Sequence, residues 1–144
     1  MKNLLFYLYL SSSLMLVVAC SKEKEPITDD TLKVGQITLN DTLTIGYQTT
    51  LVDEANHLSL TFDSMLSESR CPIGVVCFWQ GNVAVKLTFK KGDLEYPFTF
   101  DSYFKPETTV GGYDFHFLDA TPYPDISKSV DDSVYQVKLW MRKD

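Results

Sequence analysis

Apolar and polar residues alternate along most of the chain after residue 31, with the period of two that is typical of β-strands. The clearest example is the run 83–89, in which every second side chain is apolar: Val83, Val85, Leu87 and Phe89. In an extended chain the residues between them point to the opposite face. The run therefore predicts a strand with one face in a core and one face toward solvent.

Four other runs repeat this alternation. Residues 91–93 (Lys-Gly-Asp) predict a hairpin turn into the next strand. The apolar sets are Leu58, Leu60 and Phe62; Leu94, Tyr96, Phe98 and Phe100; Tyr113, Phe115 and Phe117; and Tyr135, Val137, Leu139 and Met141. Pro97 lacks the N–H that a neighbouring strand would need, so its strand is expected at a sheet edge.

The first part of this region changes parity. Leu32 and Val34 share one parity, whereas Ile37, Leu39, Leu43 and Ile45 share the other. The change falls near Gly35 and Gln36, where a β-bulge would produce it. Asn40 and Asp41 predict a turn between the two segments.

These runs predict about seven short strands, with turns between them and no helix of useful length. The expected fold is all-β, an antiparallel β-sandwich, with a small β-barrel as the alternative. The long connections at residues 102–112 and 121–132 favour the sandwich. One domain, residues 32–144, accounts for all of them.

The first 19 residues have the pattern of a signal peptide. Lys2 is followed by a mostly apolar run, residues 4–18, which is shorter than the ~20 residues that span a bilayer. The run ends in Leu-Val-Val-Ala before Cys20, which is the pattern of a lipobox. We therefore expect cleavage after Ala19, lipidation of Cys20 and a lipid anchor. The alternative is an ordinary signal peptide with an incidental cysteine.

The expected location is the bacterial cell envelope, lipid-anchored in the outer membrane, on its periplasmic or its surface side. Residues 20–31 are rich in charge and poor in apolar residues, so they predict a solvated, lipidated tether. Lys22 and Glu23 resemble a surface-export tag, with a plain charged linker as the alternative reading.

Charge limits the choice of partner. Removing residues 1–19, which hold Lys2 and no acidic residue, leaves 12 basic and 19 acidic residues and a formal charge of −7. Nucleic acids and anionic lipids attract Lys and Arg. We therefore expect no nucleic-acid partner.

Cys71 and Cys77 are the two thiols left after lipidation of Cys20, and in an oxidising envelope so close a pair is expected to form a disulfide. A redox or metal role fits less well. Redox motifs place two residues between the cysteines, and zinc needs more than two ligands.

Arg70-Cys71-Pro72, followed by Cys77, Trp79 and Gly81, resembles the Arg-Cys-Pro…Cys-x-Trp-x-Gly signature of small uncharacterised bacterial lipoproteins. Residues 121–124 (Thr-Pro-Tyr-Pro) and the alternating set Tyr135, Val137 and Leu139 extend the resemblance over most of the domain. Glu68-Ser69 departs from the Asp-Ser expected before Arg70. The resemblance implies a β-domain with the signature between two strands, and it implies no activity.

Two readings of the signature remain open. In the structural one, Trp79 packs on the disulfide, Arg70 pairs with an acid such as Glu68 or Asp63, and Gly81 supplies a backbone angle closed to other residues. In the functional one, the loop presents apolar side chains to a partner. Its binding residues would be Arg70, Val75, Val76, Phe78 and Trp79.

Catalytic chemistry is not indicated. Neither a nucleophile elbow nor a phosphate-binding glycine loop is present. Asp114 and His116 share one face of a strand, but a metal site needs further ligands. His57 reads as a turn residue. We expect no enzyme activity, no cofactor and no metal.

The sequence thus predicts a non-enzymatic binding or accessory protein with an unknown protein or glycan partner. One alternative is an inhibitor of a protease or lysozyme, with the loop 71–77 plugging a cleft. The other is a glycan-binding module that uses Trp140, Tyr103 and Tyr123.

Overall fold

The computed structural model describes residues 34–144, which form nine β-strands and one short 3-10 helix. The predictions for residues 1–33, including lipidation of Cys20, concern residues outside those that the structure describes. The elements are β1 (Val34–Gln36), β2 (Asp41–Gly46), β3 (Thr50–Asp53), β4 (Leu58–Glu68), β5 (Val83–Lys91), β6 (Leu94–Asp101), β7 (Glu107–Val110), β8 (Tyr113–Thr121), η1 (Asp132–Val134) and β9 (Gln136–Lys143).

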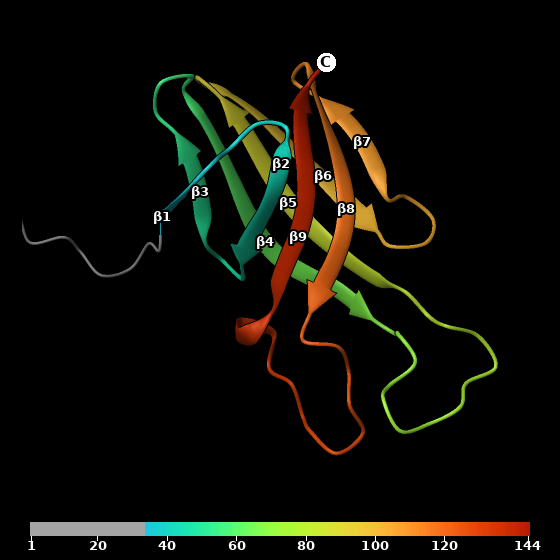
Figure 1. The fold of residues 1–144 in the computed structure, drawn as a ribbon. Coiled ribbons are helices and arrows are strands. Elements are labelled where there is room, and N and C mark those ends of the chain that lie inside the picture. Colours follow the sequence, from blue (N-terminus) through green and yellow to red (C-terminus); the bar gives the residue numbers. More distant parts are fainter. Residues whose placement is uncertain (1–33) are drawn as a thin grey trace, which may run out of the picture.

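The strands form two sheets that pack face to face (Figure 1). One sheet has the order β1-β3-β4-β5-β6, and the other has the order β2-β9-β8-β7. Neighbours are antiparallel except for β1 and β3, which are parallel. The sheets do not close into a barrel, so the predicted β-sandwich is confirmed.

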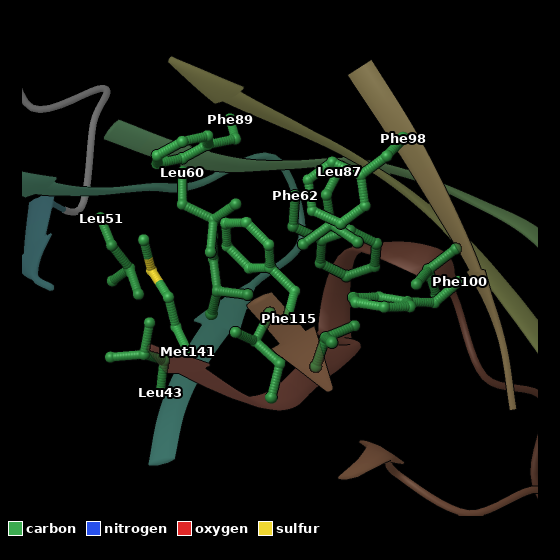
Figure 2. Close-up of a cluster of buried hydrophobic side chains, with 14 of the residues drawn as sticks. Leu43, Leu51, Leu60, Phe62, Leu87, Phe89, Phe98, Phe100, Phe115 and Met141 are labelled. Atoms are coloured by element: carbon green, nitrogen blue, oxygen red, sulfur yellow. The ribbon is translucent and has the colours of Figure 1, made fainter. Parts of the chain in front are cut away.

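The alternating apolar residues of both sheets meet in a single core (Figure 2). Phe62 of β4, Phe89 of β5 and Phe115 of β8 are fully buried, and the rings of Phe89 and Phe115 lie 5.2 Å apart, edge to face. Aromatic side chains bury large apolar areas, so their burial dominates the stabilisation of a small sandwich.

The strand that contains Pro97 lies at a sheet edge, as predicted. Pro97 lies on β6, which is an edge strand of its sheet, and opposite Thr88 of β5. The prediction for Leu94 on the same strand was wrong, because Leu94 is 60% exposed. It is the first residue of β6, beyond the reach of the other sheet.

The parity change near Gly35 has a cause other than the predicted bulge. β1 belongs to one sheet and β2 to the other, and the chain crosses between them at residues 37–40. Ile37 lies in this crossing segment and is buried, and Asn40 has a left-handed backbone conformation (φ 60°) in the predicted turn. The change of parity therefore coincides with the passage of the chain from one sheet to the other.

Three connections gather at one end of the sandwich, because β4, β6 and β8 all run toward it. Figure 1 shows the two longest, between β4 and β5 and between β8 and β9, at its lower end. The third, residues 102–106, joins β6 to β7 and is tied to the start of β5 by a hydrogen bond from Ser102 N–H to the Val83 carbonyl (2.9 Å). We call this the stapled end, after the disulfide described below.

Candidate binding surface

A disulfide joins Cys71 and Cys77, whose Cα atoms are 5.8 Å apart, so this prediction is confirmed. It closes the outer part of the β4–β5 connection. The base of the connection is held by two backbone hydrogen bonds, from Ser69 N–H to the Asn82 carbonyl (2.9 Å) and from Cys71 N–H to the Gln80 carbonyl (2.8 Å). The loop 71–80 is thus constrained at its base and along its length.

Gly81 occupies a position that only glycine fills without strain. Its φ is +71°, in the left-handed region, and a Cβ at this position would overlap the Ser69 carbonyl and lie 2.8 Å from the Arg70 Cα. This close approach lets the two sides of the loop base hydrogen-bond. The predicted role of Gly81 in the signature is confirmed.

Arg70 joins the loop to the rest of the stapled end. Its guanidinium is buried and donates to both Glu68 carboxylate oxygens, to the Ala120 carbonyl (2.6 Å) and to the Pro122 carbonyl (3.2 Å). The Tyr123 ring lies over the guanidinium, with its centroid 4.6 Å from Cζ. Of the two acids that the sequence offered, Glu68 is therefore the partner.

Charge at this cluster stays fixed near neutral pH. Burial lowers the pKa of Arg70, but the hydrogen bond and the negative charge of Glu68 outweigh it, so the pKa lies above its ordinary value. Burial and the nearby Glu68 charge also raise the pKa of Tyr135, whose hydroxyl donates to Glu68 (3.3 Å). One buried cation thus joins the end of β4 to the end of β8 and the residues that follow it, without changing its protonation.

The loop itself presents apolar side chains to solvent. Val76 and Phe78 are fully exposed (102% and 107%), and Ile73 and Val75 are about half exposed. Trp79 is half exposed, and its ring meets that of Tyr103 edge to face, with centroids 6.4 Å apart. The structure thus places Val75, Val76, Phe78 and Trp79 outward, and Arg70 inward.

Other exposed apolar residues surround the loop. Among the described residues, every exposed large hydrophobic side chain except Leu94 lies in or beside the connections of the stapled end: Leu66, Ile73, Val75, Val76, Phe78, Trp79, Tyr103, Phe104, Leu118, Tyr123, Ile126 and Val134. Scattered surface hydrophobics need no explanation, but a gathering of this kind is typical of an interaction surface.

A groove runs between the loop and the β8–β9 connection. Its volume is about 440 Å³, and its walls include Ile73, Tyr123, Val130 and Val134. The Ile73 N–H donates to the Pro124 carbonyl (2.9 Å), which joins the two connections. The sequence pattern did not predict this pairing, because the two segments are about 50 residues apart. The apolar residues within 122–134 are a signal of an apolar surface there, but not of its contact with Ile73.

The remaining candidates lie elsewhere. His116 and Trp140 are neighbours on the outer face of β8 and β9, with ring centroids 5.2 Å apart, and His116 Nδ1 lies 3.1 Å from a Glu107 oxygen. Trp140 thus lies within strand β9, whereas Tyr103 and Tyr123 belong to connections of the stapled end. His57 lies in a turn, as predicted, with φ +52°. Within residues 34–144, no group of three His, Cys, Asp or Glu side chains could hold a metal ion.

Comparison with protein-family models, with curated proteins and with solved structures found no match. No helix in the described part of the chain is long and apolar enough to cross a membrane. The function is therefore argued from the geometry of the stapled end.

Proposed function

We propose that this chain is a lipid-anchored, non-enzymatic binding protein of the bacterial cell envelope, and that the stapled end holds its partner. The observation that carries the proposal is the full exposure of Val76 and Phe78 on a disulfide-closed loop, within a larger apolar surface. Exposing bulky apolar groups to water costs free energy, and a partner would remove that cost.

Rigidity supports a binding role for this surface. Ordering a loop on association costs roughly 0.5–1.5 kcal/mol for each immobilised side chain, and a loop that is already constrained avoids part of it. The disulfide, the hydrogen bonds at the base and the Arg70 cluster all constrain the loop before any partner arrives. Anchoring by lipid at Cys20 would keep this surface at the membrane that carries it.

The test is a quantitative cross-linked pull-down from the native membranes, read by mass spectrometry. We compare the wild type with Phe78→Ser and with Leu94→Ser, a matched control because Leu94 is similarly apolar and lies at the opposite end. We expect one stoichiometric partner, retained by Leu94→Ser and reduced about tenfold or more by Phe78→Ser, as for interface hot spots. Equal recovery by both variants would refute the proposal.

An inhibitor is the second candidate, and the protrusion of Val76 and Phe78 favours it, because a rigid apolar loop fits an enzyme cleft. The assay is inhibition of proteases and lysozyme by the purified chain. Inhibition that Phe78→Ser abolishes would make the partner an enzyme, and no inhibition at micromolar chain would remove this candidate.

A further inference from the structure

The groove beside the loop carries a charge pattern that restricts what it can bind. Asp125 and Asp131 line it, and Asp132 lines an adjoining hollow of about 210 Å³. Lys128 borders both and is the one cation among their lining residues. Within residues 34–144, no ion pair involves Asp125, Asp131 or Asp132.

The pKa values of Asp125 and Asp131 lie below the ordinary value of an aspartate, so these two carboxylates are ionised over the physiological range. Hydrogen bonds from the hydroxyl and the N–H of Ser127 lower the pKa of Asp125, and those from Ser133 lower the pKa of Asp131. The same bonds fix the two carboxylates in position at the rim of the groove. The groove therefore combines apolar walls with a lasting excess of negative charge.

That combination favours one class of occupant. An anionic membrane surface would be repelled, and burying the carboxylates in a lipid interior would be costly. A peptide segment with a bulky apolar residue can use the walls formed by Ile73 and Val134, and a basic residue beside it can pair with Asp125 or Asp131. The volume of about 440 Å³ lies within the range of ligand-binding pockets, roughly 300–1,000 Å³.

We propose that this groove binds an extended segment of a protein partner in which Lys or Arg lies next to a bulky apolar residue. The inference rests on the proposed function, because it names the chemistry of the partner that the stapled end holds. Attraction between the carboxylates of the groove and a basic residue selects this partner, whereas the exposed loop supplies apolar contact.

The experiment is selection from a random 12-residue peptide library displayed on phage, against the full lipidated chain in zwitterionic nanodiscs, with empty nanodiscs as counter-selection. We expect enriched peptides to share a basic residue next to an aromatic or large aliphatic one. Their affinity, measured by fluorescence polarisation, should fall about tenfold between 50 and 500 mM NaCl, because salt screens the charges. Acidic or purely apolar peptides, no enrichment, or affinity independent of salt would overturn the inference.

Three variants test the groove itself. Asp125→Asn with Asp131→Asn keeps one acceptor oxygen at each position, and we expect it to weaken the selected peptides about tenfold or more. Asp93→Asn, in the β5–β6 turn at the opposite end, should leave them unchanged. Lys128→Gln should tighten binding about threefold, a gain that a misfolded protein cannot produce; weaker binding by Lys128→Gln would overturn the inference.

The outcomes separate this inference from the proposed function. If the partner recovered from membranes depends on Phe78 but the peptides do not depend on Asp125 and Asp131, only the charge-selected groove fails. If the partner recovered from membranes does not depend on Phe78, the proposed function fails, whatever the peptides do.

Discussion

At the residue scale, the loop depends on positions where one amino acid has no substitute. Gly81 is the clearest case, because two independent costs fall on any replacement. Any other residue at this position would have to adopt a positive φ, and its Cβ would overlap the backbone of Ser69. At Gly92, by contrast, only the first of these costs applies.

We therefore expect Gly81→Ala to lower the free energy of unfolding by about 3 kcal/mol or more, through strain and forced displacement of the Ser69 backbone. Gly92→Ala is the matched control. Gly92 also has a positive φ (+58°), but no heavy atom lies within 4 Å of its would-be Cβ. Its cost should be about 1 kcal/mol, from the backbone angle alone. Urea denaturation of the two variants checks the difference, and equal losses would contradict it.

Arg70 supports a second prediction at this scale. Lysine keeps the charge but has one ammonium group, which cannot serve Glu68, Ala120 and Pro122 together. Arg70→Lys should therefore destabilise the fold by roughly 2 kcal/mol, since buried acceptors lose their donors. Arg142→Lys, on an exposed arginine that pairs with Asp114, should cost about 0.5 kcal/mol or less. Thermal and urea unfolding measure both, and similar losses would show that Arg70 is not the joint between these segments.

At the element scale, the connection between β6 and β7 depends on one carboxylate. One oxygen of Asp101 accepts the N–H groups of Tyr103 (3.0 Å) and Phe104 (2.9 Å), and the other accepts from the Asn82 side chain (2.6 Å). Burial raises the pKa of Asp101, but these hydrogen bonds outweigh it and hold the pKa below its ordinary 3.8.

A lowered pKa fixes the direction of the pH effect. The stabilisation from Asp101 is present above its ordinary, unfolded pKa of 3.8 and is lost as pH falls through the lower folded value. Asp101→Asn, which keeps an acceptor for the two N–H groups, should lose less stability than the wild type between pH 7 and pH 3. Urea denaturation at the two pH values tests this, with Asp93→Asn as a matched charge change. An identical acid loss in wild type and Asp101→Asn would contradict the assignment.

The strands and the loop differed in how far the sequence could predict them. Long alternating runs such as 83–89 predicted strands correctly, because a buried face requires period two over its whole length. β3 and β7, four residues each, were not predicted, because so few residues carry little periodicity. Closure of the loop was predictable from the spacing of the two cysteines, and the role of Gly81 from the signature, but the partner of Arg70 was narrowed only to Glu68 or Asp63. The groove was not, since it depends on the contact of Ile73 with Pro124.

At the scale of the whole molecule, the sandwich separates a rigid scaffold from an interacting end. The two sheets bury most of their inner-face side chains in one core, so that the apolar side chains exposed at the stapled end are additional to it. β1 enters its sheet opposite Thr50, which in turn pairs with Thr61, seven residues before the end of β4. The first described residue therefore lies roughly 20 Å from the stapled end, at ~3.3 Å per residue.

The proposed lipid anchor makes this distance consequential. Residues 20–33 span at most about 50 Å when fully extended. This length exceeds the distance from Val34 to the stapled end, so a tether of this length lets the stapled end reach a partner away from the bilayer.

Deleting residues 24–30 halves this reach and touches none of the described residues. We expect an unchanged melting temperature and unchanged affinity for the selected peptides, but cross-linking to the membrane partner reduced severalfold, because the effective concentration collapses when a linker cannot span its sites. Replacing 24–30 with seven Gly and Ser residues is the control and should restore cross-linking, since length and not sequence sets the reach. If the deletion cross-links as well as the wild type, the partner lies close to the anchor; if the Gly-Ser replacement also fails, the tether makes contacts of its own.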